Sequence, residues 1–252
     1  KHLAPEQPKN GEPRTGMAMG DHAAVTALEW NIGRAEQDQL AFNSHKNMAA
    51  AYDRGFFNDL VTPYQGLSRD NNMRKDITLE KLATLKTCFG KGEGATMTAA
   101  NSTPLTDGAS VVLLASEEWA KERGLPVLAY LTFSEVAAVD FVHKKEGLLM
   151  APAYAVPRML ERAGIKLQDF DFYEIHEAFA AQVLACVQGL KLDESRLNIH
   201  GGAIALGHQL GMSGARLVGT LTRSMQRGDV RYGVASLCIG VGQGLAAVFE
   251  KV

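Results

Sequence analysis

Hydrophobic and polar residues follow two different patterns along the chain, and the pattern changes near residue 105. In the first hundred residues, apolar positions recur at intervals of three and four mainly between Arg34 and Phe57. The recurring positions are Ala41, His45, Met48, Tyr52 and Phe56. This spacing predicts a helix over 34–57 that Gly55 closes. A loop over 59–75, a short helix over 78–85 and a glycine-rich turn over 90–94 are expected to follow, and this part is predicted to cover another part of the molecule.

From Asp107 onward the sequence predicts alternating strands and helices. Val111 to Ala115 is an apolar run that fits a buried strand, and Ser116 is a favourable N-cap for a helix over 117–123. Further strands are expected over 127–133, 170–175, 232–238 and 245–250, and further helices over 152–164, 178–189 and 213–226. Strands separated by helices of this length imply a layered α/β fold with a mixed sheet. The chain shows no internal repeat.

Composition narrows the function classes but does not choose among them. The 252 residues are 46% hydrophobic and 21% charged, with a formal net charge of −2. This balance is typical of a globular protein and argues against nucleic acid or an anionic membrane as the main partner. The longest uncharged stretch, 232–249, is rich in glycine, which favours two buried strands joined by a turn over a membrane span.

The cysteines and the first residues of the chain bear on the cellular compartment of the protein. The three cysteines, Cys88, Cys186 and Cys238, form no C-x-x-C pair, so a reducing compartment is the default interpretation. Residues 1–15 are rich in Pro, Lys and Glu and are expected to be a flexible or cleaved lead-in. Because residue 1 is Lys, we expect the natural start, and any targeting segment with it, to lie outside the sequence.

Three short segments carry residues capable of chemistry. The first, Ile175-His176-Glu177-Ala178-Phe179, lies where a predicted strand passes into a helix, and strand ends in α/β sheets are where ligands bind. Its alternative interpretation is a half-buried histidine satisfied by a neighbour. A zinc-protease interpretation fails, because H-E-x-x-H needs a second histidine where Ala180 stands.

The second segment, 201–208, reads Gly-Gly-Ala-Ile-Ala-Leu-Gly-His and continues to Gly211 and Ser213-Gly214. Its glycines permit close backbone approach, and a histidine held before a helix can act as a base. Packing of tight turns also explains the glycines. The third segment, 238–244, reads Cys-Ile-Gly-Val-Gly-Gln-Gly. Too few residues follow it for a dinucleotide-binding unit, whereas Cys238 at a strand end can titrate beside free backbone N–H groups, unless it is a buried structural cysteine.

Together and in this order, the three segments resemble the thiolase family. The signature blocks are H-E-A-F-A at 176–180, G-G-A-I-A-L-G-H at 201–208 and C-I-G-x-G-Q-G at 238–244. Segments 80–86 and 101–109 also resemble family segments, and the resemblance extends from about Gly16 to the last residue. His rather than Asn at 176 resembles the degradative 3-ketoacyl-CoA thiolases, which include the β-subunits of fatty-acid β-oxidation complexes.

The resemblance implies an architecture. We expect an α/β fold with a thiolase-like layered α-β-α arrangement, a mixed five-stranded sheet and an inserted loop domain. The expected division is a loop domain over 1–104, a remnant of the N-terminal core over 105–127 and a C-terminal domain over 128–252. The chain then corresponds to the C-terminal three-fifths of a thiolase, with the N-terminal half-core absent. Without that half, the segment Asp107 to Arg123 is expected to expose apolar surface.

The resemblance also implies an activity, the cleavage of 3-ketoacyl-CoA by coenzyme A or the reverse condensation. His208 would accept the proton of a nucleophilic cysteine, and Cys238 would protonate the acetyl-CoA enolate and later activate coenzyme A. The Gly240 N–H would hold the thioester oxyanion, and His208 with His176 would hold the enolate oxygen. The nucleophilic cysteine itself is expected in the missing N-terminal part, so this fragment alone is predicted to be inactive.

Binding residues and partners follow from the same resemblance. Coenzyme A contacts are expected at Arg74, Ala99, Thr103 and Phe179, with coenzyme A as substrate and neither a cofactor nor a metal. Expected partners are the missing N-terminal half or a companion chain, a second copy in a homodimer or homotetramer, and a hydratase–dehydrogenase subunit. The expected location is the cytoplasm, or the mitochondrial matrix in a eukaryote.

Two residues depart from the family pattern, and two alternative functions remain open. Gln209 and His200 replace what are commonly Pro and Asn around the catalytic histidine. One alternative function is a naturally truncated, non-catalytic subunit that binds coenzyme A or assists assembly. The other is a ketoacyl synthase of the same fold, against which Cys238 argues, since those enzymes lack this second cysteine.

Overall fold

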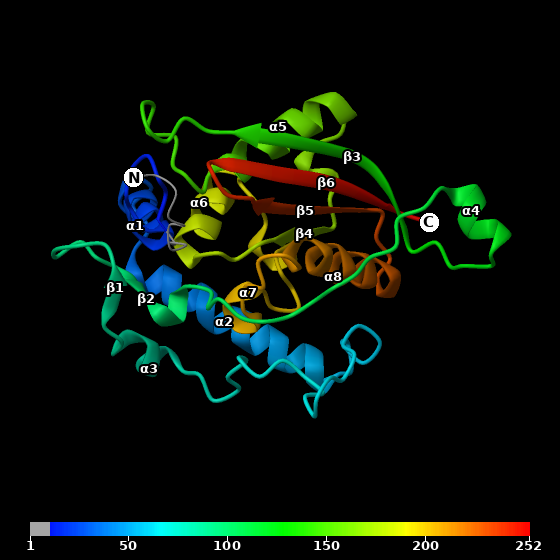
Figure 1. Cartoon of the computed structure of the whole chain (residues 1–252), viewed down its shortest axis with the longest axis horizontal. Coiled ribbons are helices and arrows are strands. Elements are labelled where there is room, and N and C mark those ends of the chain that lie inside the picture. Colours follow the sequence, from blue (N-terminus) through cyan, green and yellow to red (C-terminus); the bar gives the residue numbers. More distant parts are fainter. Residues whose placement is uncertain (1–10) are drawn as a thin grey trace, which may run out of the picture.

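A four-stranded mixed sheet lies at the centre of the molecule in the computed structural model, which describes residues 11–252 (Figure 1). Its strands are β3 (Ala129–Ala138), β4 (Phe172–Ile175), β5 (Tyr232–Cys238) and β6 (Gln243–Lys251), in the order β3-β6-β5-β4. β6 runs antiparallel to both of its neighbours, and β4 runs parallel to β5. The parallel pair places the ends of β4 and β5 at the same edge of the sheet.

Helices cover both faces of this sheet. Helices α5 (Ala151–Ala163) and α6 (Ala180–Leu190) pack on one face through a cluster that includes Val156, Met159 and Val183. Helix α8 (Ser213–Arg227) packs on the other face through Leu217, Leu221 and Met225. The side chains of a strand alternate between the faces, so Tyr173 and Ile175 of β4 join the first cluster and Phe172 joins the second. The predicted layered α-β-α arrangement with a mixed sheet is confirmed.

The first hundred residues form helices and a small hairpin beside the sheet (Figure 1). The helices are α1 (Met19–Glu29), α2 (Arg34–Asp53) and α3 (Leu79–Ala83), with the 3-10 turn η1 (Ala99–Asn101). The hairpin consists of β1 (Thr87–Phe89) and β2 (Met97–Thr98). Elsewhere lie α4 (Glu117–Glu122), α7 (Ala203–Leu206), η2 (Leu167–Asp169) and η3 (Glu194–Arg196). Helix α2 packs against α7 through an apolar cluster and so contacts the glycine-rich segment.

The hydrophobic pattern located most of these elements, with two differences of length. Helix α2 ends at Asp53, before Gly55, whose φ of 73° ends the helix. Strand β3 runs five residues beyond its predicted end because it pairs with β6 along its whole length. The sequence missed α1, whose buried residues are mostly small or polar and give no apolar stripe.

The predicted strand over 111–115 is wrong. Residues 106–116 have no helix or strand, and Val111, Leu113 and Leu114 are 91%, 71% and 66% exposed. An apolar run becomes a strand only when a neighbouring strand supplies its hydrogen-bond partners, and none of the four strands pairs with this segment. The predicted five-stranded sheet therefore has four strands within the described residues. The expectation that Asp107 to Arg123 exposes apolar surface is confirmed.

Both ends of the chain bear on earlier expectations. Residues 1–10 of the predicted flexible lead-in lie outside the described residues, but Glu12 is buried and accepts hydrogen bonds from Arg14 Nε and Thr15 N, so residues 12–15 form a turn. The uncharged stretch 232–249 forms β5 and β6, as predicted.

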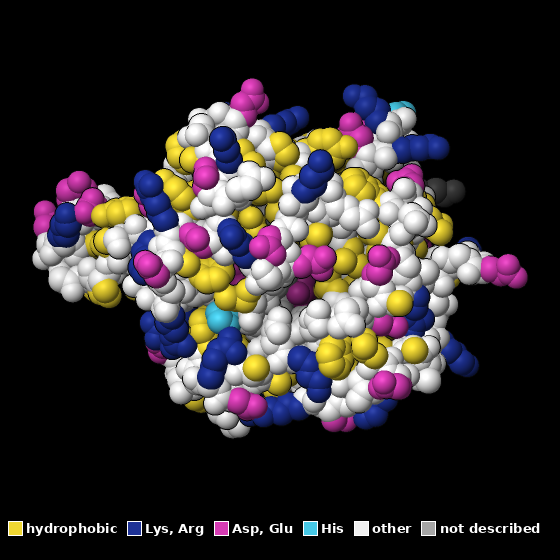
Figure 2. Space-filling view, turned by 180° about the vertical axis from the view of Figure 1, so that it is seen from behind, with side chains coloured by type: hydrophobic (Ala, Val, Ile, Leu, Met, Phe, Trp, Pro, Cys, Tyr) yellow, Lys and Arg dark blue, Asp and Glu magenta, His cyan; other side chains and the backbone are white. Residues whose placement is uncertain are grey.

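None of the helices described for residues 11–252 has the length and apolar character needed to cross a membrane. On the face shown in Figure 2, Lys and Arg side chains are interspersed with Asp and Glu.

Candidate active site

Two histidines from separate segments meet at the edge of the sheet where β4 ends. His176 follows β4, and His208 follows the short helix α7 and Gly207. Their ring centroids are 4.2 Å apart. The His176 backbone N–H donates to Ser236 O on β5 at 2.9 Å, which continues the parallel pairing beyond the end of β4. The structure thus brings together two of the residues that the sequence singled out.

The second histidine is held by both its backbone and its ring. His208 N donates to Pro104 O at 2.8 Å, and Thr106 N donates to His208 O at 3.3 Å, so the crossing segment 104–106 fixes the backbone. The ring atom Nδ1 lies 2.7 Å from Ser213 Oγ. The Ser213 hydroxyl also lies 3.0 Å from Gln209 O, and when it donates its only proton there, it accepts the bond from Nδ1–H. In this tautomer, Nε2 of neutral His208 is unprotonated and available as a base.

The first histidine is buried, and its ring nitrogens lack partners among the described residues. His176 is 1% exposed, and neither Nδ1 nor Nε2 has a hydrogen-bond partner there. Buried polar atoms are nearly always paired, so such a ring marks a place for a polar atom of a ligand. Burial, followed by the neighbouring His208 and the charge of Arg216, lowers the pKa of His176 well below its usual value. Burial and then Arg216 also lower the pKa of His208. Both rings are therefore neutral at physiological pH.

Cys238 lies at the end of β5, on the edge of the sheet where His176 leaves β4. Residue Ile175 of β4 pairs with Ser236 of β5, two residues before the cysteine. Burial raises the pKa of the half-buried thiol to about 11, so it is protonated at neutral pH and suits proton donation. The turn that follows contains Gly240 with φ of 81° and Gly242 with φ of 77°, a conformation that side chains disfavour. Gly240 is exposed at this edge.

The expected coenzyme A contacts fall into two groups. Thr103 lies beside both histidine segments, because its N–H donates to Ala178 O at 3.1 Å and its hydroxyl donates to Ala203 O at 2.6 Å. Phe179 is buried nearby and contacts Phe89 edge to face. Ala99 is exposed in η1. The exposed Arg74 instead lies against α2, where its backbone N–H donates to His45 Nδ1. Nothing in these contacts tests the binding roles, which stay predictions.

Sequence reasoning missed a buried carboxylate that joins the two histidine segments to α2. Glu177 accepts hydrogen bonds from Ser44 Oγ at 2.7 Å, Asn198 Nδ2 at 2.9 Å and Ile204 N at 3.1 Å. Ser44 Oγ also accepts from Gly202 N at 2.9 Å. We call these residues, Glu177, Ser44, Asn198, Gly202 and Ile204, the carboxylate clamp. The only signal in the sequence was an acidic residue directly after His176 in an otherwise apolar segment.

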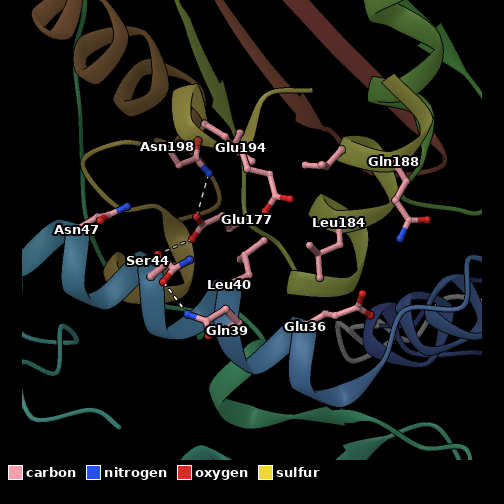
Figure 3. Close-up of a pocket in the computed structure, with 13 residues that line it drawn as sticks. Glu36, Gln39, Leu40, Ser44, Asn47, Glu177, Leu184, Gln188, Glu194 and Asn198 are labelled. Carbon is pink, nitrogen blue, oxygen red and sulfur yellow. Dashed lines mark hydrogen bonds between the residues drawn. The ribbon is translucent and has the colours of Figure 1, made fainter. Parts of the chain in front are cut away.

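A cavity of about 280 Å³ lies beside the carboxylate clamp (Figure 3). In the close-up, Ser44, Glu177 and Asn198 lie together, joined by hydrogen bonds, and Leu40 and Leu184 lie on α2 and α6. Amide and carboxylate side chains from Glu36, Gln39 and Gln188 form much of its rim. Neither of the two histidines lines this cavity, although Glu177, which does, directly follows His176.

The two departures from the family pattern are both buried. Gln209 packs against Gly108, and its Oε1 has no partner among the described residues. His200 stacks on Phe56 with ring centroids 3.6 Å apart, and burial, followed by the charges of Arg54 and Arg227, lowers its pKa to about 4.

No group of three or more His, Cys, Asp or Glu residues within 11–252 could hold a metal ion.

Comparison with sequence families finds two matching domains. The family model described as "Thiolase, C-terminal domain" matches residues 125–251, and "Thiolase, N-terminal domain" matches residues 11–118. The expectation that the chain holds only the C-terminal three-fifths of a thiolase, without the N-terminal half-core, is therefore not supported, since counterparts of both domains are present. The division into segments 1–104, 105–127 and 128–252 stays a prediction.

Individual relatives carry related names. "3-ketoacyl-CoA thiolase 1, peroxisomal" of Arabidopsis thaliana is 41% identical over 93% of this chain and 55% of its own length. "3-ketoacyl-CoA thiolase" of Pectobacterium carotovorum is 40% identical over 99% of this chain and 62% of its own length. The chain thus spans between half and two thirds of the curated relatives that it matches.

Solved structures agree in fold. Human mitochondrial 3-ketoacyl-CoA thiolase in complex with CoA superposes with a TM-score of 0.91 at 33% identity, over 100% of this chain and 66% of that one. Bacillus anthracis acetyl-CoA acetyltransferase superposes with a TM-score of 0.89 at 36% identity, over 100% of this chain and 66% of that one.

Proposed function

Because this chain belongs to the thiolase family, we propose that it takes part in the cleavage of a 3-ketoacyl-CoA by coenzyme A to acetyl-CoA and a shortened acyl-CoA, or in the reverse condensation. The observation that carries this proposal is the meeting of His176 and His208, 4.2 Å apart, at the sheet edge where Cys238 ends β5. The names of the relatives support the same chemistry. The natural role that this chemistry fits is a step of fatty-acid β-oxidation.

His208 is the base of the proposed reaction. Its Nδ1–H is engaged by Ser213, so Nε2 accepts the proton of the attacking thiol. The proton must be removed because an ordinary thiol is mostly protonated near neutral pH. Burial and Arg216 lower the pKa of His208, which keeps the ring unprotonated and ready for this step.

Cys238 is the proton donor. When the bond between the α and β carbons of the substrate breaks, the electron pair passes to the acetyl-CoA enolate, and the Cys238 thiol protonates its carbon. The raised pKa of this thiol, about 11, supports the donating role because the proton is in place at neutral pH. The resulting thiolate then takes the proton of incoming coenzyme A, which restores the thiol.

Two sets of donors hold the oxygens that become negative. The histidine pair would hold the enolate oxygen, which gives one ring nitrogen of His176 a partner that it lacks among the described residues. The Gly240 N–H would hold the thioester oxyanion together with the N–H of the nucleophile. Arg74, Ala99, Thr103 and Phe179 would contact coenzyme A.

The nucleophilic cysteine of this proposal lies outside the 252 residues. Cys186 is fully buried in α6, and burial raises its pKa to about 12. Cys88 is an exposed residue of β1, but its thiol group is partly buried. This partial burial, followed by the charge of Asp21, raises the pKa of the thiol. Cys238 already serves as the proton donor. The chain alone is accordingly proposed to bind coenzyme A without cleaving 3-ketoacyl-CoA.

Partners and compartment follow the family resemblance and remain proposals. The chain is proposed to work with a segment or companion chain that supplies the nucleophile, in a homodimer or homotetramer. A hydratase–dehydrogenase subunit is a further proposed partner. The proposed location is the cytoplasm, or the mitochondrial matrix in a eukaryote.

The test measures both binding and cleavage with the purified 252-residue chain. Calorimetry with coenzyme A is expected to show binding, and the thiolysis assay with acetoacetyl-CoA is expected to show no loss of substrate. Thiolysis by the chain alone would refute the assignment of the nucleophile. Absence of coenzyme A binding would refute the proposed substrate.

A further inference from the structure

A buried arginine lies on the same side of the sheet as the two histidines. Arg216 is in the first turns of α8, three residues after Ser213, which holds His208. Its side chain is 12% exposed, and its Nη1 lies 3.5 Å from Glu174 Oε2. A buried charge of this kind is costly unless it is paired or has a role. After burial, its charge contributes to the lowered pKa of His208, and the proposed reaction assigns Arg216 no contact with a reacting group.

The register of β4 places this ion pair beside His176. Tyr173 and Ile175 face α5 and α6, so Glu174 faces α8, and His176, two residues further, lies beyond the end of the strand on the same side. The guanidinium that contacts Glu174 therefore lies near the His176 ring, whose centroid is 4.2 Å from that of His208. The register thus places the charge of Arg216 on the side of the sheet where the two imidazoles meet.

The arginine is under-satisfied at this position. Its Nε and Nη2 are buried and have no hydrogen-bond partner among the described residues. Three carboxylates influence its charge, namely Glu174, Glu177 and Asp70. Burial raises the pKa of Glu174 to about 8, so near neutral pH Glu174 does not fully cancel the positive charge. Burial also raises the pKa of Glu177 and of Asp70.

We propose that Arg216 is a positioning residue of the site, whose buried charge acts through the paired imidazoles. Anchored by Glu174, it favours the neutral form of both rings and favours negative charge on any oxygen atom that the rings bind. It does not touch the reacting atoms. The lowered pKa values of His176 and His208, in both of which burial comes first and Arg216 contributes, support this geometry.

The inference concerns the same site as the proposed function, but it can be tested without turnover. The readout is the titration of individual imidazoles, followed by long-range 1H–15N correlation spectra of the full chain between pH 5 and 9. Variants H176N and H208N identify the two signals among the seven histidines. A failure to cleave or to bind coenzyme A therefore leaves this test unaffected.

Four variants separate charge from structure. R216Q removes the charge and is expected to raise the titration midpoint of His208 by about one pH unit, the order of the effect that a nearby unit charge has on a pKa. R216K keeps the charge and is expected to keep the wild-type midpoint. E174Q is also expected to keep it, because burial raises the pKa of Glu174 to about 8 and so keeps this group largely uncharged in the pH range where His208 titrates. R223Q, on the same helix but paired with the half-exposed Asp59, is the matched control and is expected to change nothing.

Each outcome decides the proposal. A folded R216Q with the wild-type midpoint would overturn it, as would an equal rise in R216K, which would assign Arg216 a purely structural role. If R216Q does not fold, the double variant E174Q/R216Q removes both groups without leaving an unpaired buried carboxylate. It is expected to raise the midpoint as R216Q does, and an unchanged midpoint in the double variant would overturn the proposal.

Discussion

Substituting Ser44 by alanine tests the carboxylate clamp that connects α2 to both histidine segments. The Ser44 hydroxyl donates to Glu177 Oε2 at 2.7 Å and accepts from Gly202 N at 2.9 Å, and all these groups are buried. Alanine removes both bonds and brings no new partner. The carboxylate keeps its bonds from Asn198 and Ile204, so the clamp is weakened but not abolished.

The expected loss follows from two contributions. A hydrogen bond to a charged group contributes about 1.5–3 kcal/mol, and a buried N–H left without a partner costs about 1–3 kcal/mol. Allowing for relaxation around the site, S44A should lower the free energy of unfolding by about 3 kcal/mol. For a chain of this size, that corresponds to a fall in Tm of about 6–12 °C.

Urea denaturation followed by circular dichroism measures this loss, with Tm as a second readout. The matched control is S110A, since Ser110 also donates one hydrogen bond, to Met212 O at 2.7 Å, but is exposed. S110A is expected to change the free energy of unfolding by less than about 0.5 kcal/mol. If S44A is no less stable than S110A, the clamp does not hold the two segments as argued.

Three further predictions concern stability and thiol access. The pKa of His200 in the folded chain is about 4, so between about pH 6.5 and 4 only the unfolded chain binds a proton there, and stability falls as the pH drops through this window. H200N should reduce the slope of the free energy of unfolding against pH in this window by up to about 1.4 kcal/mol per pH unit. An unchanged slope would contradict the argument that burial lowers this pKa. G202A places a methyl group inside the carboxylate clamp and should lower the free energy of unfolding, measured in urea, by about 3 kcal/mol or more. G211A, whose methyl group meets no atom nearby, is the control and should remain within about 0.5 kcal/mol of wild type. Equal stabilities of the two variants would refute the close packing of Gly202 against Glu177. In a thiol-titration assay of the native protein, the exposed Cys88 should react first and the buried Cys186 only after unfolding, and simultaneous reaction of both would be inconsistent with the fold.

The sequence predicted the layers of the fold better than the connections between them. Periodicity located α8 and β5 closely because each buries a regular apolar face. It failed for 111–115, since strand formation depends on a neighbour that composition cannot reveal. It also missed α1, which buries small residues without an apolar stripe.

The chemistry-bearing residues were found through their order along the chain, but not the groups that hold them. His176 and His208 stood out because the first begins and the second ends a short signature segment, and the fold places their rings together. Ser44 and Glu177 are 133 residues apart, and a serine in the middle of a helix gives no sign of a distant carboxylate. Arg216 likewise resembles any helical arginine until β4 places Glu174 opposite it.

The central claim is that Cys238 exchanges a proton with the α-carbon of a coenzyme A thioester while His208 holds the enolate oxygen, and proton exchange measures this without the nucleophilic cysteine. Acetyl-CoA is incubated with the chain in D2O, and deuterium in its methyl group is followed by mass spectrometry. The account predicts incorporation above the buffer rate in the wild type and a loss of about a hundredfold or more in both H208A and C238A. Incorporation at the buffer rate in the wild type, or at the wild-type rate in either variant, would contradict it.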